Sequence, residues 1–150
     1  MSQDLYNDAI LREAKGSASA SPRLESPDLT VTLDNPLCGD RVTLDLRLGE
    51  GSRVVAAVGH KTRGCMLTQA AASVLARRAP GTTTDELRAV VRGLEASLRG
   101  AAEPEPTWPE LEMFRPVHAI RSRHECVLLP FHALEDALAQ AESPRAEKRP

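Results

Sequence analysis

The sequence lacks a basic surplus and a long apolar segment. Its 19 Lys and Arg residues face 21 Asp and Glu residues, so the formal net charge is −2 with His neutral. Nonspecific nucleic-acid binding and polybasic membrane attachment both require excess positive charge. No apolar run approaches the roughly 20 residues of a transmembrane helix, and the opening residues MSQDLYND do not resemble a signal peptide. We therefore expect a cytoplasmic protein that binds neither nucleic acid nor a membrane.

The sequence also lacks the cysteine pattern of a disulfide-bonded protein. The chain has three cysteines, an odd number, and no export signal, so a disulfide framework is not expected. Reduced cysteines of this kind are core residues, metal ligands or catalytic groups. With 150 residues the chain is predicted to form a single domain, 1–150, which can bury a core without disulfides.

The hydropathy pattern changes from strand-like to helical along the chain. A first helix is predicted at 4–15, followed by a flexible Ser-, Gly- and Pro-rich loop at 16–27 and, at the other end, a polar tail at 143–150. Period-two alternation predicts three strands, at 28–34, 42–48 and 53–61. Period-3.6 patterns predict helices at 66–79, 84–98 and 126–141, with short helical turns between 109 and 123. Because strands and helices are segregated, the predicted class is α+β, a small three-stranded antiparallel sheet packed against a layer of helices.

Each cysteine lies at a predicted junction between elements. Cys38 stands in the segment NPLCGD between two strands, where the flanking Pro and Gly indicate an accessible loop, and Asp40 is two residues away. Cys65 follows Gly64 at a helix start, where free amides and the helix dipole favour the thiolate. Cys126 also stands at the head of a helix. Each thiol taken alone is equally compatible with a packing role.

Taken together, the three thiols favour a shared metal ion. Tetrahedral zinc is held by four Cys, His or Asp/Glu ligands, and thiolates select zinc or iron–sulfur chemistry. Cys38, Cys65, Cys126 and Asp40 complete such a set. The fourth ligand could instead be His124 or His60, while His118 and His132 have no partner motif.

These residues resemble the IscU/SufU/NifU N-terminal family of iron–sulfur assembly proteins. The resemblance is carried by the segment from Asn35 to Asp40 ahead of an alternating strand, by Gly64-Cys65, and by Cys126 opening a last helix. It implies the family's α+β fold and the metal ligands Cys38, Asp40, Cys65 and Cys126. The N-terminal region departs from the family, since Arg12 to Gly16 replaces its His-Tyr-x-Asn-Pro-Arg segment.

Two features resemble the SufU branch more than IscU. The separation of Cys65 from Cys126 is long, like the SufU insertion, and Arg123 matches a SufU-like arginine. IscU-type proteins carry His immediately before the last cysteine, where this chain has Glu125.

The resemblance implies a zinc-dependent sulfur acceptor, a possible sulfurtransferase. It would take persulfide sulfur on Cys38 from a PLP-dependent, SufS-like cysteine desulfurase and stimulate that enzyme, with Arg123 assisting the partner or the thiolate. The alternative is a scaffold on which a nascent iron–sulfur cluster is assembled and transferred to downstream acceptor proteins. A third reading is purely structural zinc. The sequence leaves the metal, the oligomeric state and the identity of the desulfurase open.

Overall fold

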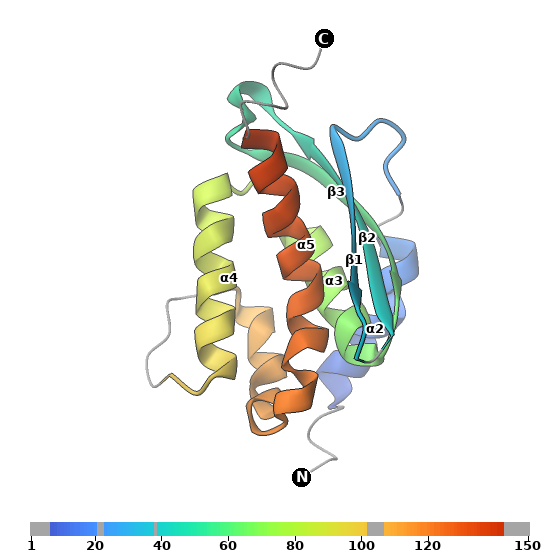
Figure 1. Ribbon diagram of the computed structural model, residues 1–150, viewed down its shortest axis with the longest axis vertical. Coiled ribbons are helices and arrows are strands. Elements are labelled where there is room, and N and C mark those ends of the chain that lie inside the picture. Colours follow the sequence, from blue (N-terminus) through green and yellow to red (C-terminus); the bar gives the residue numbers. More distant parts are fainter. Residues whose placement is uncertain (1–6, 21–22, 38, 102–106, 143–150) are drawn as a thin grey trace.

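The computed structural model describes residues 7–20, 23–37, 39–101 and 107–142. Within them an antiparallel sheet lies against a group of helices (Figure 1). The helices are α2 (Asp8–Ala20), α3 (Met66–Arg78), α4 (Thr84–Leu98) and α5 (His124–Glu142), the strands are β1 (Leu29–Asn35), β2 (Asp40–Leu48) and β3 (Val55–Arg63), and 3-10 turns are η1 (Glu50–Ser52), η2 (Pro109–Ala119) and η3 (Arg121–Arg123). The predicted α+β class and the three predicted strands are confirmed.

The sheet has the order β1-β2-β3, and its register follows the alternation seen in the sequence. Asn35 pairs with Asp40 at the β1–β2 hairpin, and Leu44 pairs with His60 across β2 and β3. Val42, Leu44 and Leu46 of β2 are almost completely buried. Since successive side chains of a strand point to opposite faces, one face of the sheet is apolar and must be covered.

Two helices cover this apolar face. Helix α5 packs on β1 and β2, and α3 packs beside it on β3. Helix α2 packs on α3, and α4 lies on the side of α5 away from the sheet (Figure 1). Helix α3 is rich in buried alanine, with Ala70, Ala71 and Ala72 all 2% exposed or less, and small side chains permit close approach of its neighbours.

Helix α4 begins at Thr84, as predicted, and Thr83 is its N-cap. The Thr83 side chain accepts a hydrogen bond from the Glu86 amide, and the Glu86 carboxylate accepts one from the Thr83 amide. This reciprocal capping box satisfies two backbone donors that the first turn leaves unpaired. At the other end Gly100 adopts φ +91°, the left-handed conformation expected of the residue after a helix.

The predicted division between a helix at 4–15 and a loop at 16–27 is wrong at its boundary. Helix α2 continues to Ala20, so residues 16–20 are helical. Ser and Ala tolerate a helix, and the first proline of the segment comes only at position 22. Residues 4–6 and the predicted tail 143–150 lie outside the described residues. In the described part of the chain no helix is both long and apolar enough to cross a bilayer.

Candidate metal centre

Three residues that are far apart in the sequence meet at one end of the fold. Asp40 is the first residue of β2, Cys65 is the N-cap of α3, and Cys126 lies in the first turn of α5. Each offers one ligand atom, and these atoms all lie within 4.8 Å of one another. Asp40 is 2% exposed and Cys126 is fully buried, whereas Cys65 is half-buried. The hairpin, the β3–α3 junction and the start of α5 thus converge on a small site with one face open.

Asp40 is held in place by the β3–α3 junction. Its Oδ1 accepts a hydrogen bond from the Cys65 amide at 3.2 Å, and its Oδ2 accepts one from the Thr68 hydroxyl at 2.8 Å. A Cβ added at Gly64 would overlap Asp40 Oδ1 and lie 2.7 Å from Asp40 Cγ. The Gly64-Cys65 pair therefore meets two needs, because glycine lets the carboxylate approach the backbone and the next amide binds it.

The pKa of the Cys65 thiol is lowered to about 5. The main cause is the hydrogen bond with Cys126, which outweighs the opposing effect of burial. The Thr68 backbone amide adds to the lowering, and the nearby Asp40 charge opposes it. A thiolate is the form that binds metal ions and acts as a nucleophile. Cys65 is therefore prepared for either role.

Cys38, the fourth predicted ligand, lies outside the described residues, so its placement stays a prediction. Its described neighbours belong to the β1–β2 turn, in which Asn35 accepts hydrogen bonds from the amides of Gly39 and Leu37 at 2.8 Å and 3.1 Å. Gly39 has φ +74°, which favours glycine. Leu37 is 92% exposed.

The two histidines considered as alternative ligands do not belong to this cluster. His60 is buried, with Nδ1 2.9 Å from Thr62 Oγ1 and Nε2 without a hydrogen-bond partner, and burial lowers its pKa. His124 Nε2 lies 3.0 Å from the carbonyl oxygen of His118. Neither is grouped with Asp40, Cys65 and Cys126.

Arg123 ends the 3-10 turn η3 directly before α5, where it is half-buried. It stands three residues ahead of Cys126, and its suggested role toward a partner or a thiolate stays a prediction. Thr68 is a site residue that the sequence reasoning missed. The available signal was its position three residues after Cys65, which on a helix brings its side chain near the N-cap.

A second group of possible ligands lies between α4 and α5. Glu95, His132 and Glu135 each offer an atom within 4.8 Å of the others, and His132 Nε2 is 2.8 Å from Glu95 Oε2. His132, for which the sequence offered no partner, thus forms a hydrogen bond that connects two helices.

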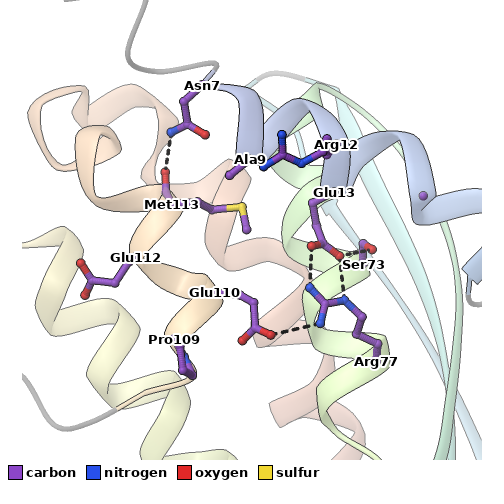
Figure 2. A pocket seen from close by; sticks show the side chains of 11 residues that line it. Asn7, Ala9, Arg12, Glu13, Ser73, Arg77, Pro109, Glu110, Glu112 and Met113 are labelled. Carbon is purple, nitrogen blue, oxygen red and sulfur yellow. Dashed lines mark hydrogen bonds and ion pairs between the residues drawn. The ribbon is translucent and has the colours of Figure 1, made fainter.

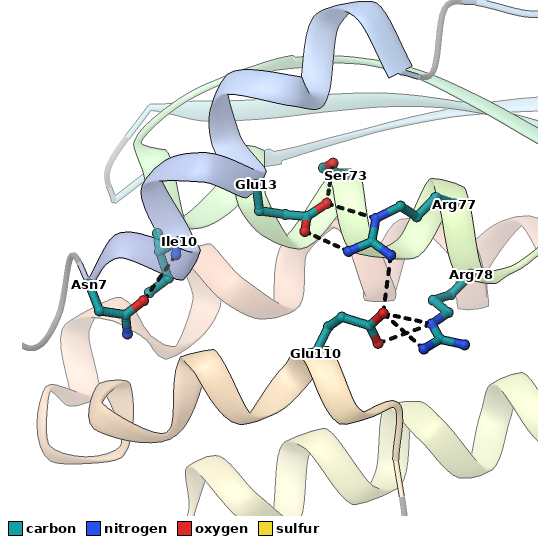
Figure 3. Close-up of polar contacts among 7 residues, drawn as sticks. All are labelled: Asn7, Ile10, Glu13, Ser73, Arg77, Arg78 and Glu110. Carbon is teal, nitrogen blue, oxygen red and sulfur yellow. Dashed lines mark hydrogen bonds and ion pairs between the residues drawn. The ribbon is translucent and has the colours of Figure 1, made fainter.

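A groove with a volume of about 680 Å³ lies between α2, α3 and η2 (Figure 2). On its wall Glu13 of α2 binds Arg77 at 2.6 Å, and Arg77 and Arg78 of α3 both bind Glu110 of η2 (Figure 3). Ser73 donates to Glu13 at 2.6 Å. This network connects three elements of the fold and contains none of the cysteines.

The fold is a small α+β domain in which a three-stranded antiparallel sheet carries a helical layer, and one aspartate and two cysteines that could hold a metal ion gather where strands meet helix starts. Residues 5–107 match the NifU-like N terminal domain family, so the chain belongs to that family. The family is one of iron–sulfur cluster assembly scaffold proteins.

Relatives and solved structures agree with this assignment. The chain is 26% identical to the iron–sulfur cluster assembly scaffold protein IscU of Thermotoga maritima, covering 93% of this chain and 96% of that protein. It is 24% identical to the zinc-dependent sulfurtransferase SufU of Bacillus subtilis, covering 92% of each. The crystal structure of a nitrogen-fixing NifU-like protein (N-terminal) from Brucella abortus superimposes with a TM-score of 0.84 at 35% identity, over 97% of both chains. A SUF-system scaffold structure, FiSufU from Fervidobacterium islandicum, gives a TM-score of 0.82 at 25% identity, over 89% of this chain and 96% of that one.

Proposed function

We propose that this protein is a zinc-dependent sulfur acceptor that works in the cytoplasm. It takes persulfide sulfur from a PLP-dependent, SufS-like cysteine desulfurase and stimulates that enzyme. The observation that carries the proposal is the convergence of Asp40, Cys65 and Cys126, whose ligand atoms lie within 4.8 Å of one another.

The donor set fits zinc. Two sulfur atoms and one carboxylate oxygen are ligands that zinc accepts, and Cys38 would supply the fourth. The lowered pKa of Cys65, caused mainly by its hydrogen bond with Cys126, favours the thiolate form that zinc binds. When bound, zinc would keep the thiolates deprotonated and protect them from oxidation.

The chain's own residues define how sulfur would be received. The Cys38 thiolate attacks the outer sulfur of the desulfurase persulfide. The sulfur–sulfur bond of that persulfide breaks, the desulfurase cysteine leaves as a thiolate, and Cys38 carries the new persulfide. Leu37 and Met66, the sequence neighbours of Cys38 and Cys65, are 92% and 45% exposed and would offer a partner apolar side chains at the surface. Arg123 would steer the partner or stabilise the thiolate.

The surroundings of Cys126 favour the sulfur acceptor over the cluster scaffold. The residue before Cys126 is Glu125, whose side chain is 57% exposed and lies 3.9 Å from His132 Nδ1. His124 is bonded to the His118 carbonyl. No histidine therefore joins the described ligand group, in contrast to the IscU pattern described above.

Scaffold activity is the second candidate. It is favoured by the match to the Thermotoga maritima IscU scaffold over 93% of this chain. The same ligands would then hold a nascent iron–sulfur cluster for transfer to acceptor proteins, and Asp40, a hard ligand among thiolates, would keep that cluster labile.

Desulfurase turnover tests the acceptor role. We expect the wild-type protein to stimulate a SufS-like desulfurase, Cys38→Ala to abolish the stimulation, and the control His124→Ala to retain it, because His124 lies outside the ligand group. Unchanged stimulation by Cys38→Ala would reject Cys38 as the acceptor.

Metal analysis separates the two candidates. Protein purified without added metal is expected to contain one zinc ion per chain that resists replacement by iron. A stoichiometric cluster that forms on anaerobic reconstitution and transfers to an acceptor protein would favour the scaffold. Unfolding on zinc removal with no desulfurase response would instead indicate structural zinc.

A further inference from the structure

Thr68 links two members of the ligand group and is not itself a ligand. It lies in the first turn of α3 and its side chain is fully buried. Its Oγ1 is 2.8 Å from Asp40 Oδ2 and 3.5 Å from Cys65 Sγ. A buried hydroxyl between a carboxylate and a thiol is costly to place unless its hydrogen bonds are satisfied.

The hydroxyl has one proton and can donate it to one acceptor at a time. At 2.8 Å the hydrogen bond to the Asp40 carboxylate is the shorter of the two contacts and has a charged acceptor. The Thr68 hydroxyl therefore donates its proton to this bond, and the Thr68 oxygen faces Cys65 with its lone pairs. Together with the Cys65 amide, which binds the other oxygen at 3.2 Å, Thr68 fixes the plane of the carboxylate.

We propose that Thr68 is a positioning residue that holds Asp40 in the orientation needed to bind the metal. This inference rests on the metal centre of the proposed function. Side chains that hydrogen-bond to a metal ligand orient it, and losing one costs roughly 10- to 100-fold in metal affinity. Thr68→Val keeps the shape of the side chain and removes the donor, so the Asp40 carboxylate loses one of the hydrogen bonds that orient it.

The test uses zinc affinity, from competition with a chromophoric chelator, and the visible absorption of the cobalt-substituted protein. We expect roughly 10- to 100-fold weaker zinc binding and a changed cobalt spectrum for Thr68→Val. Thr68→Ser, which keeps the hydroxyl, is expected to restore both.

The matched control is Ser73→Ala. Ser73 is a buried hydroxyl on the same helix that donates to the Glu13 carboxylate at 2.6 Å, away from the ligand group. The substitution Ser73→Ala should lower the free energy of unfolding and leave the zinc affinity unchanged. Wild-type affinity in Thr68→Val, or an equal loss in Ser73→Ala, would overturn the inference.

A double-mutant comparison keeps the inference testable if Thr68→Val does not fold. If Thr68 acts through Asp40, adding Thr68→Ala to Asp40→Asn should cause no further loss of zinc affinity, whereas two independent effects would add and would overturn the inference. A wild-type protein that binds no zinc contradicts the proposed function itself, so the two failures are distinguishable.

Discussion

Substituting Gly64 by alanine tests whether the close approach of Asp40 to the β3–α3 junction organises the site. The added Cβ would lie 2.7 Å from Asp40 Cγ, whereas carbon atoms in contact are separated by about 3.5 Å or more. The carboxylate must therefore move by about 0.8 Å. Such a shift breaks at least one of its hydrogen bonds, which now measure 2.8 Å to Thr68 and 3.2 Å to the Cys65 amide.

A hydrogen bond to a charged group contributes about 1.5–3 kcal/mol, so we expect Gly64→Ala to lower the free energy of unfolding of the metal-free protein by about 2–3 kcal/mol. Zinc affinity should fall roughly 10- to 100-fold, because the ligand loses its orienting contacts. Urea unfolding and chelator competition measure the two effects.

Gly16→Ala is the matched control, since nothing lies within 4 Å of a Cβ built there and the residue is helical. Alanine in a helix interior is favoured over glycine by about 0.5–1 kcal/mol, so this variant should be more stable with unchanged zinc binding. If Gly64→Ala matched the wild type in both measurements, the carboxylate would not depend on this contact and the reasoning would be refuted.

Three further predictions concern stability and are checked by urea unfolding. Burial raises the pKa of the Asp45 carboxyl, but hydrogen bonds from Arg23 and its other donors outweigh this and hold the pKa below its ordinary value. The ionised carboxylate thus adds stability that is fully present above about pH 4 and is lost as the pH falls through the folded-state pKa. The free energy of unfolding that Asp45→Asn loses relative to the wild type should therefore be smaller at pH 3 than at pH 7. An equal loss at both pH values would contradict the prediction. Thr83→Ala removes the α4 N-cap and should cost about 1 kcal/mol, with no change in zinc content. Arg77→Ala should cost only about 1 kcal/mol, less at high salt, because its side chain is 43% exposed although it pairs with Glu13; a salt-independent loss would argue against an ionic contribution.

The site could be predicted from the sequence only as a set of residue types at junctions. Gly64-Cys65 at a change from alternation to helical period indicates a sharp turn and a helix start, and the structure has both. Thr68 could not be recognised in the same way, because a threonine within a helix does not by itself indicate a site residue. Its role depends on Asp40, which is 28 residues away in the chain and reaches it only through the pairing of β2 with β3.

Local patterns determined the strands, most helix positions and the α+β class. The reason is that the buried face of a strand or helix requires apolar residues at a spacing of 2 or 3.6, and this spacing can be read within one segment. The extension of α2 to Ala20 was not evident, since small residues such as Ser and Ala are compatible with both loop and helix. Tertiary structure alone decided that Asp40, Cys65 and Cys126 share one centre, and that His60 and His124 do not. Such distances depend on how α3 and α5 pack on the sheet, which is a property of the whole core and not of any segment.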